Sequence, residues 1–244
     1  MGELKRPGGE LASRPLHFFW VVDCSGSMYI EGKMGVVNTA IQDCIPEMRA
    51  EAENNPNAQL MIRALQFSTG ASWRTTAPVP IEDYSWEDLE PDGVTDFGKA
   101  CELLAAQLSM PPMPERALPP VLVLLSDGQP TDDYKSGLNK LKALPWYKKA
   151  VKIAISIGKD ADDDVLAEFV GNRELVLQAN NATTLAKMIK WASTTASMVS
   201  APASKPMVEV GEEDPFAASD NNVPVIIDMG NIPNPDDIGA DDVW

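Results

Sequence analysis

Apolar stretches alternate along this chain with segments whose apolar residues recur at helical spacing. The apolar stretches predict strands over residues 16–22, 59–68, 121–125, 151–157 and 174–178. The helical spacing predicts helices over residues 33–52, 95–109, 132–144, 162–170 and 182–197. Strands that are apolar almost throughout are typical of a parallel sheet covered by helices on both faces. We therefore expect an α/β fold with a doubly wound, mainly parallel central sheet and right-handed crossovers.

One short strand is expected to break this parallel order. Residues 72–80 are joined to the preceding strand by Thr69-Gly70, and so short a connection favours an antiparallel hairpin. The prolines that end the segment favour the edge of the sheet.

A different proline, Pro46, lies inside the first predicted helix and is expected to kink it or to end its regular part.

Acidic charge is unevenly distributed along the chain. The net charge is −16 over 244 residues, and residues 200–244 contribute −9 of it, with ten acidic residues and one lysine. Their mixture of Ala, Ser, Pro, Gly and acids is typical of disorder. We therefore expect a mobile amino-terminal segment over residues 1–13, one domain over residues 14–198, and an acidic, Pro- and Ala-rich extension over residues 199–244.

This acidic extension has three interpretations. Its apolar run Val223–Ile227 could add as an extended strand to an exposed sheet edge and so bind a partner or the domain itself. A carboxylate such as Asp228 or Asp237 could occupy a metal site of the same or another copy. The simplest alternative is a solvated segment that only improves solubility.

Composition argues against several classes of function. Nucleic acid would be repelled by the acidic charge, and no cluster of Lys and Arg offsets it. The sequence has no apolar run of the length of a membrane helix, and its start lacks the apolar stretch of a signal peptide, so we expect a cytoplasmic protein.

The chain has three cysteines, Cys24, Cys44 and Cys101. They form no C-x-x-C pair, which argues against a disulfide framework or a zinc site. Only Cys24, in a loop, could be reactive, and the neighbouring Asp23 disfavours its thiolate.

Other polar residues have structural interpretations. His17 is the only histidine and lies near the start of a predicted central strand, so we expect it to be structural rather than catalytic. The acidic run 160–164 suggests calcium, but it lacks the Gly and terminal Glu of an EF-hand loop, and acids favouring the start of a helix explain it better. Asp132 and Asp133 likewise suit the first turn of a helix opened by Thr131.

Three separated segments carry oxygen-bearing side chains to places that a parallel sheet would bring together. Asp23-Cys24-Ser25-Gly26-Ser27 leaves the first strand, Thr95 opens a helix, and Ser126-Asp127-Gly128 follows the strand 121–125. Loops at the carboxyl ends of parallel strands converge on one crevice. Oxygen-only ligands suit a hard divalent cation. The candidate metal ligands are therefore Asp23, Ser25, Ser27, Thr95 and Asp127.

In this order and spacing, Asp-x-Ser-x-Ser, Thr and Ser-Asp-Gly resemble the von Willebrand factor type A domain and its metal-ion-dependent adhesion site, MIDAS. The resemblance covers roughly residues 14–198. The segments 22–28 and 126–133 are most similar to bacterial TerY-type proteins of tellurite-resistance and stress-response gene clusters.

The resemblance implies a Rossmann-like fold and a magnesium site, with Mn²⁺ or Ca²⁺ as alternatives. In that family the metal recognises a carboxylate of a partner protein. It further implies an adaptor in a bacterial stress-response or defence pathway, with a protein kinase or a metal-dependent protein phosphatase as partner, and no enzymatic activity of its own.

An enzyme is the alternative. An Asp at a strand end beside Mg²⁺, here Asp23, could accept a phosphoryl group, either in transfer or as a receiver, and Lys159 could neutralise it. Against this, a haloacid-dehalogenase pattern needs an Asp at the position of Ser25. A passive scaffold with an inactive metal site is a third possibility.

Overall fold

A computed structural model describes residues 13–127, 129–159 and 161–200 of this chain. The expectations for residues 1–12 and for residues 201–244 lie outside this part. The strands are β1 Arg14–Asp23, β2 Ala58–Ser68, β3 Gly70–Trp73, β4 Val79–Pro80, β5 Val121–Ser126, β6 Val151–Ile157 and β7 Val176–Ala179. The helices are η1 Gly26–Gly32, α1 Lys33–Glu53, α2 Phe97–Gln107, α3 Tyr134–Ala143, α4 Pro145–Lys149, α5 Asp163–Val170, η2 Arg173–Leu175 and α6 Ala182–Ser200.

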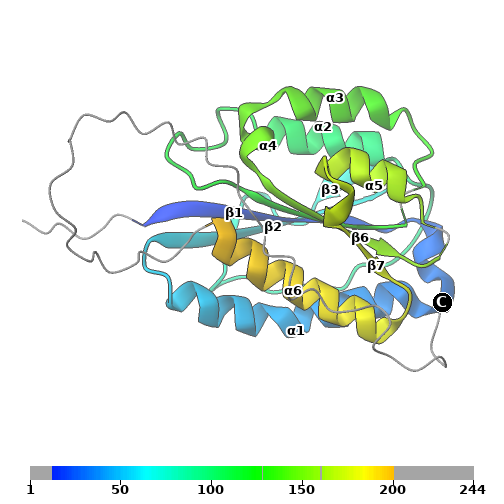
Figure 1. The fold of residues 1–244 in the computed structure, drawn as a ribbon, viewed down its shortest axis with the longest axis horizontal. Coiled ribbons are helices and arrows are strands. Elements are labelled where there is room, and N and C mark those ends of the chain that lie inside the picture. Colours follow the sequence, from blue (N-terminus) through cyan, green and yellow to red (C-terminus); the bar gives the residue numbers. More distant parts are fainter. Residues whose placement is uncertain (1–12, 128, 160, 201–244) are drawn as a thin grey trace, which may run out of the picture.

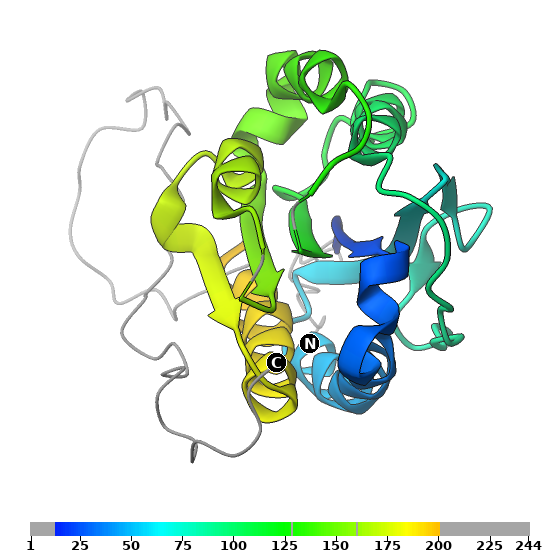
Figure 2. The same ribbon diagram turned by 90° about the vertical axis from the view of Figure 1, so that its right-hand side faces the viewer.

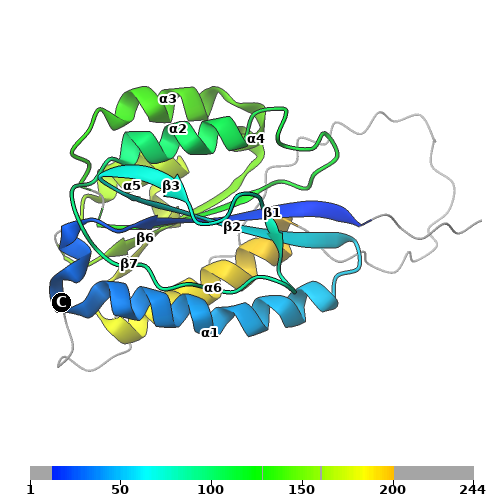
Figure 3. The same ribbon diagram turned by 180° about the vertical axis from the view of Figure 1, so that it is seen from behind.

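The strands of the described part form a single sheet in the order β3-β2-β1-β5-β6-β7, with β4 also paired to β2. β2, β1, β5, β6 and β7 are parallel, and β3 and β4 run antiparallel to β2. Figure 1 shows helices on both sides of this sheet, and Figure 3 shows from behind that α1 and α6 cover one side together. The expected doubly wound, mainly parallel α/β fold is confirmed.

The central strand β1 explains why both faces must be covered. Phe18, Trp20 and Val22 point into a core built with α1 and α6, and Phe19 and Val21 point into a second core built with α2, α3, α4 and α5. All five side chains are fully buried. Because successive side chains of a strand point to opposite faces, a strand that is apolar throughout needs a helical layer on each side.

The segment 72–80 was expected to be one strand and is two. β3 and β4 each pair with β2, and the chain between them turns around Arg63. The Arg63 guanidinium donates to the carbonyl oxygens of Thr75 at 3.0 and 3.2 Å and of Thr76 at 3.0 Å. These carbonyl groups are therefore used by a side chain instead of a neighbouring strand.

Pro46 does not end its helix, because α1 continues to Glu53. A proline inside a helix removes one hydrogen bond. The apolar face of α1 nevertheless continues past it, since Ile41, Ile45 and Met48 are all buried in the core against the sheet. Tertiary packing of this face outweighs the local cost. None of the described helices is of the length and apolarity needed to span a membrane.

His17 lies near the start of β1, in accord with the structural role expected for it. The residue is only 6% exposed, its ring stacks on Phe19, and neither ring nitrogen has a hydrogen-bond partner. Burial lowers the pKa of His17 from 6.5 to about 4. The folded protein therefore holds His17 neutral over a pH range in which the unfolded chain protonates it.

This burial predicts sensitivity to acid. The folded pKa of His17 is below its unfolded value, so stability that is fully present above pH 6.5 is lost as the pH falls towards 4. Between pH 7 and pH 4.5 we expect His17 to cost about 2–3 kcal/mol of unfolding free energy. Urea unfolding of the wild type and of His17→Leu at both pH values measures this difference, because the other titrating groups are common to both proteins. An equal loss in the two proteins would contradict the prediction.

Candidate functional site

The candidate site lies at the edge of the sheet where the parallel strands end, which faces the viewer in Figure 2. Asp23 is the last residue of β1, and Asp127 directly follows β5. β1 and β5 are parallel neighbours, with Val22 opposite Leu125, so these two chain ends leave the sheet side by side. Ser25 and Ser27 follow at the start of η1, and Thr95 lies just before α2.

The Asp23 carboxylate is completely buried and held at both oxygens. Its Oδ1 accepts a hydrogen bond from the Ser25 amide at 2.8 Å, and its Oδ2 accepts one from the Ser126 hydroxyl at 2.6 Å. The hydroxyl oxygens of Ser25 and Ser27 lie 3.0 Å apart. The end of β1 and the loop after it therefore hold the oxygen-bearing side chains of Asp23, Ser25 and Ser27 close to one another.

Backbone hydrogen bonds join this loop to the segment that precedes Thr95. The Gly26 amide donates to the Gly93 carbonyl at 3.0 Å, and the Asp92 amide donates to the Cys24 carbonyl at 2.7 Å. Gly93 has a φ of +77°, and a Cβ there would lie 2.2 Å from the Thr69 hydroxyl oxygen. This close approach requires glycine at that position.

The loop after β5 is joined to the same segment. The Thr131 amide donates to the Thr95 carbonyl at 2.9 Å, and the Thr95 amide donates to the Thr131 hydroxyl at 3.1 Å. The Asp127 carbonyl in turn accepts from the Asp162 amide at 2.7 Å. The three segments that the sequence singled out are thus fastened together, and a fourth, at the start of α5, joins them.

The electrostatics of the site are those of two carboxyl groups with little access to water. Burial, reinforced by the charge of Asp127, raises the pKa of Asp23 from 3.8 to about 6 against the opposing hydrogen bonds from Ser126 and Ser25. Asp127 is 5% exposed, and its Oδ1 is buried without a hydrogen-bond partner. A buried carboxylate oxygen without a partner is costly. A cation at this place would remove that cost.

The donor set fits a hard divalent cation. Asp23, Ser25, Thr95 and Asp127 are all buried, and with Ser27 they offer only oxygen atoms. Mg²⁺ and Ca²⁺ prefer such ligands, whereas softer metals prefer nitrogen and sulfur. Within the described residues no three His, Cys, Asp or Glu side chains gather that could hold a metal. An ion here would depend on hydroxyl groups beside the two carboxylates. The role of each of the five residues as a ligand stays a prediction.

Two residues of the site had no role in the sequence-based prediction of that site. Ser126 donates to Asp23, and Thr131 fixes Thr95. Ser126 stands in the Ser-Asp-Gly motif, so its place directly before Asp127 was a usable signal. Thr131 was expected only to open a helix; its contact with Thr95 was not predicted, because it joins loops that are 36 residues apart.

Asp132 and Asp133 were expected in the first turn of one helix, but both precede that helix, and the Asp132 side chain binds a different one. α3 begins at Tyr134 after Asp133, and the Asp132 carboxylate accepts from the amides of Gly98 at 3.0 Å and Lys99 at 3.2 Å. Asp132 therefore caps α2, the helix behind Thr95, where a negative charge is favourable.

The acidic run before α5 supports the helix-start interpretation at its described positions 161–164. Asp162 accepts from the amides of Asp164 and Val165, which makes it the cap of α5. Asp163 accepts from Ser156 and Gln178, and Asp164 pairs with Arg173 at 2.5 Å. Asp160 lies outside the described residues.

Cys24 does not behave as a reactive thiol. It is 3% exposed, and burial raises its pKa to about 12, with the Asp23 charge adding to the shift. A thiol with so high a pKa holds almost no nucleophilic thiolate at neutral pH. Cys44 and Cys101 are also buried and free, in agreement with a role in the core.

No protein-family model and no curated protein matches this chain. Solved structures do match. Proximal thread matrix protein 1 from the mussel byssus is 16% identical, with 76% of this chain and 48% of that chain covered and a TM-score of 0.55. A von Willebrand factor type A protein from Catenulispora acidiphila is 16% identical over 75% and 43% of the two chains, with a TM-score of 0.56.

A third match is the mussel protein described with a zinc-occupied MIDAS motif, at 18% identity, a TM-score of 0.56, and coverage of 76% of this chain and 46% of that chain. This chain spans just under half the length of the solved structures named here. At such identities the likeness concerns the fold. The chain has the fold of a von Willebrand factor type A domain.

Proposed function

We propose that this protein is a divalent-metal-dependent protein-interaction module. Asp23, Ser25, Ser27, Thr95 and Asp127 would hold Mg²⁺, or Mn²⁺ or Ca²⁺ in its place, and a carboxylate of a partner protein would complete the coordination. One observation carries the proposal: the buried and unpartnered Oδ1 of Asp127 lies at the same sheet edge as the fully buried Asp23.

The coordination chemistry leaves room for a partner. Mg²⁺ demands octahedral coordination and is usually held by one or two carboxylates together with waters or a ligand. Two carboxylates bring the ion and its ligands close to neutral, so a further carboxylate is no longer repelled and can bind the ion as a hard oxygen donor. The zinc-occupied MIDAS motif of the mussel protein, which shares this fold, supports a divalent ion in general.

The wider role rests on the sequence resemblance alone. We propose an adaptor in a bacterial stress-response or defence pathway of the TerY type, with a kinase or a phosphatase as partner. A cytoplasmic location belongs to the same proposal.

The enzymatic alternative, phosphoryl transfer to Asp23, is less favourable in this geometry. Asp23 has no exposed surface, and both of its oxygens already accept hydrogen bonds from the Ser25 amide and the Ser126 hydroxyl. A phosphoryl donor is much larger than an ion and needs open space in line with one of these oxygens, which the fully buried Asp23 does not offer. We therefore propose a binding protein and not an enzyme.

A phospho-donor experiment separates the two classes. Incubation of the protein with acetyl phosphate and Mg²⁺, followed by mass spectrometry of the intact chain, should show no added phosphoryl group. A mass increase that disappears in Asp23→Asn would favour the enzyme or receiver.

The first test of the module is metal-dependent stability. In Mg²⁺ at a hundred times its dissociation constant, the wild type should gain about 2.7 kcal/mol of unfolding free energy, and Asp23→Asn should gain almost none. In chelator at pH 7.5, Asp23→Asn should instead be the more stable of the two proteins. The raised pKa of Asp23 means that its ionisation, half complete at pH 6 and nearly complete at pH 7.5, destabilises the fold, so Asp23→Asn should be about 1–3 kcal/mol more stable than the wild type.

Thermal or urea unfolding with and without Mg²⁺ measures both effects. Asp92→Asn is the matched control, because Asp92 is exposed and lies on the segment that precedes Thr95. It should behave like the wild type. Undiminished Mg²⁺ affinity in Asp23→Asn would contradict the proposed site.

The second test is metal-dependent partner binding. Proteins recovered from source cells on the immobilised full chain should include a set that is lost with chelator and lost on Asp23→Asn, but kept on Asp92→Asn. Quantitative mass spectrometry of the three samples measures this. Binding that ignores the chelator would instead favour a passive scaffold.

A further inference from the structure

Exposed large apolar side chains lie on the segments that supply the candidate metal site. In the described part of the chain, the exposed large hydrophobic residues are Tyr29 at 77%, Ile30 at 56%, Val94 at 46% and Met110 at 61% exposure. Three of the four lie on the segments that supply site residues, since Tyr29 and Ile30 follow Ser27 and Val94 precedes Thr95. We refer to Tyr29, Ile30 and Val94 as the apolar rim.

The backbone keeps this rim outside the core. η1 is interrupted at Ile30, which is extended, and at Glu31, whose φ of 55° is the only positive value at a non-glycine position in the described chain. The buried side chain of this turn is Met28, while Tyr29 and Ile30 stay in solvent. The hydrogen bond from Gly26 to Gly93 joins the two segments of the rim. The rim thus lies on the same two joined segments as the oxygen donors Ser25, Ser27 and Thr95.

Such a surface favours a ligand that combines apolar side chains with a carboxylate. The chain itself contains one beyond Ser200: Val225-Ile226-Ile227 is followed directly by Asp228. Three β-branched side chains complement the rim, and the adjacent carboxylate is a hard oxygen ligand for the cation. This segment is therefore a candidate occupant with both required features.

The length of the intervening chain permits this contact. α6 ends at the opposite edge of the sheet from the site, as its orange end shows in Figure 1. A helix of 19 residues is about 28 Å long. Residues 201–227 can span up to about 90 Å. The segment can therefore return along the domain to the metal site of its own chain with ample slack.

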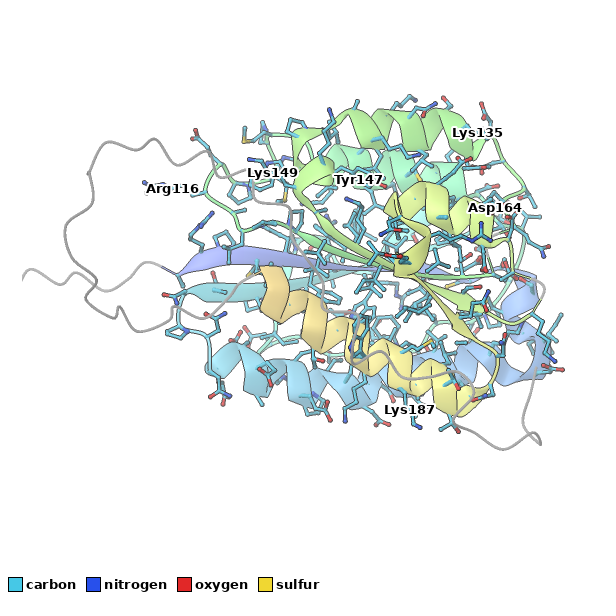
Figure 4. All side chains as sticks on the ribbon, viewed as in Figure 1. Arg116, Lys135, Tyr147, Lys149, Asp164 and Lys187 are labelled. Atoms are coloured by element: carbon cyan, nitrogen blue, oxygen red, sulfur yellow. The ribbon has the colours of Figure 1, made fainter. Side chains whose placement is uncertain are left out.

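Charge makes the contact depend on the metal. Residues 200–244 have a net charge of −9 and the rest of the chain −7. Asp164 lies towards the end of the molecule where the strands finish, and Arg116 lies at the opposite end (Figure 4). Without a cation, Asp23 and Asp127 repel an acidic segment. With a divalent cation bound, the local repulsion is replaced by coordination.

We propose that residues 225–228 of this chain dock on the metal site in cis, with Asp228 completing the coordination of the cation and Val225, Ile226 and Ile227 contacting the apolar rim. The inference rests on the proposed metal site. The docked segment would occupy the metal site when no partner is present. An outside partner must therefore displace residues 225–228 before it binds.

Calorimetric titration of Mg²⁺ into the full chain tests the contact. An occupied coordination position adds to the apparent affinity, because the docked segment binds only the metal-loaded form. Asp228→Asn and Ile30→Ser should each weaken Mg²⁺ binding by about tenfold or more, and the double variant should be no weaker than the weaker single variant. Asp220→Asn, an acid of the same segment without apolar neighbours, and Met110→Ser, an exposed apolar residue off the rim, should bind like the wild type.

A paramagnetic ion gives an independent readout. Mn²⁺ should broaden the amide NMR signals of residues 225–228 in the wild type, and the broadening should be lost in Asp228→Asn. Sedimentation should show a monomer with and without metal.

Each outcome decides between the two proposals. Mg²⁺ binding that Asp23→Asn abolishes but that Asp228→Asn and Ile30→Ser leave unchanged would overturn docking and keep the metal site. A metal-dependent dimer would overturn docking in cis. A wild type that does not bind Mg²⁺ would overturn the metal site itself.

Discussion

The burial of two carboxyl groups at the end of an apolar sheet is the constraint on which the rest of the site depends. Asp23 ends a strand whose preceding residues are buried on both faces, and burial raises its pKa to about 6. A soluble domain tolerates such a charge only with compensation. Some is local, from the Ser25 amide and the Ser126 hydroxyl. The unpartnered oxygen of Asp127 shows that this compensation is incomplete. The cation proposed for this site would complete it.

Much of this arrangement could be predicted because it follows from local patterns. A continuous apolar run fixes β1 and β5 as central parallel strands, and parallel neighbours bring Asp23 and Asp127 to one edge. The other features depend on contacts between distant segments. Arg63 divides the expected strand 72–80 in two, and Asp132 caps a helix that begins 35 positions before it in the chain. No periodicity in the sequence encodes such partners.

The same distant contacts decide which helices are linked to the site. Thr131 fixes Thr95, and the next residue, Asp132, holds the first turn of α2. α2 and α3 then pack closely, since a Cβ on Gly137 would lie 2.4 Å from the Gly98 carbonyl oxygen. The helices α2 and α3 and the loop that contains Thr95 are therefore joined to one another. The hydrogen bonds described here therefore lead from the site to α2 and α3.

The exposed apolar rim and the buried carboxylates favour different chemical groups in a ligand. The carboxylates alone would accept a free cation and water, which gives no selectivity among acidic partners. Tyr29, Ile30 and Val94 remain in solvent although burial of such side chains is worth about 25 cal/mol per Å² of apolar area. In the proposed function, a ligand gains this energy in addition to metal coordination only if its carboxylate reaches the metal while it covers the rim. Selectivity would then depend on the spacing between the rim and the oxygen donors, whose two segments the Gly26–Gly93 hydrogen bond joins.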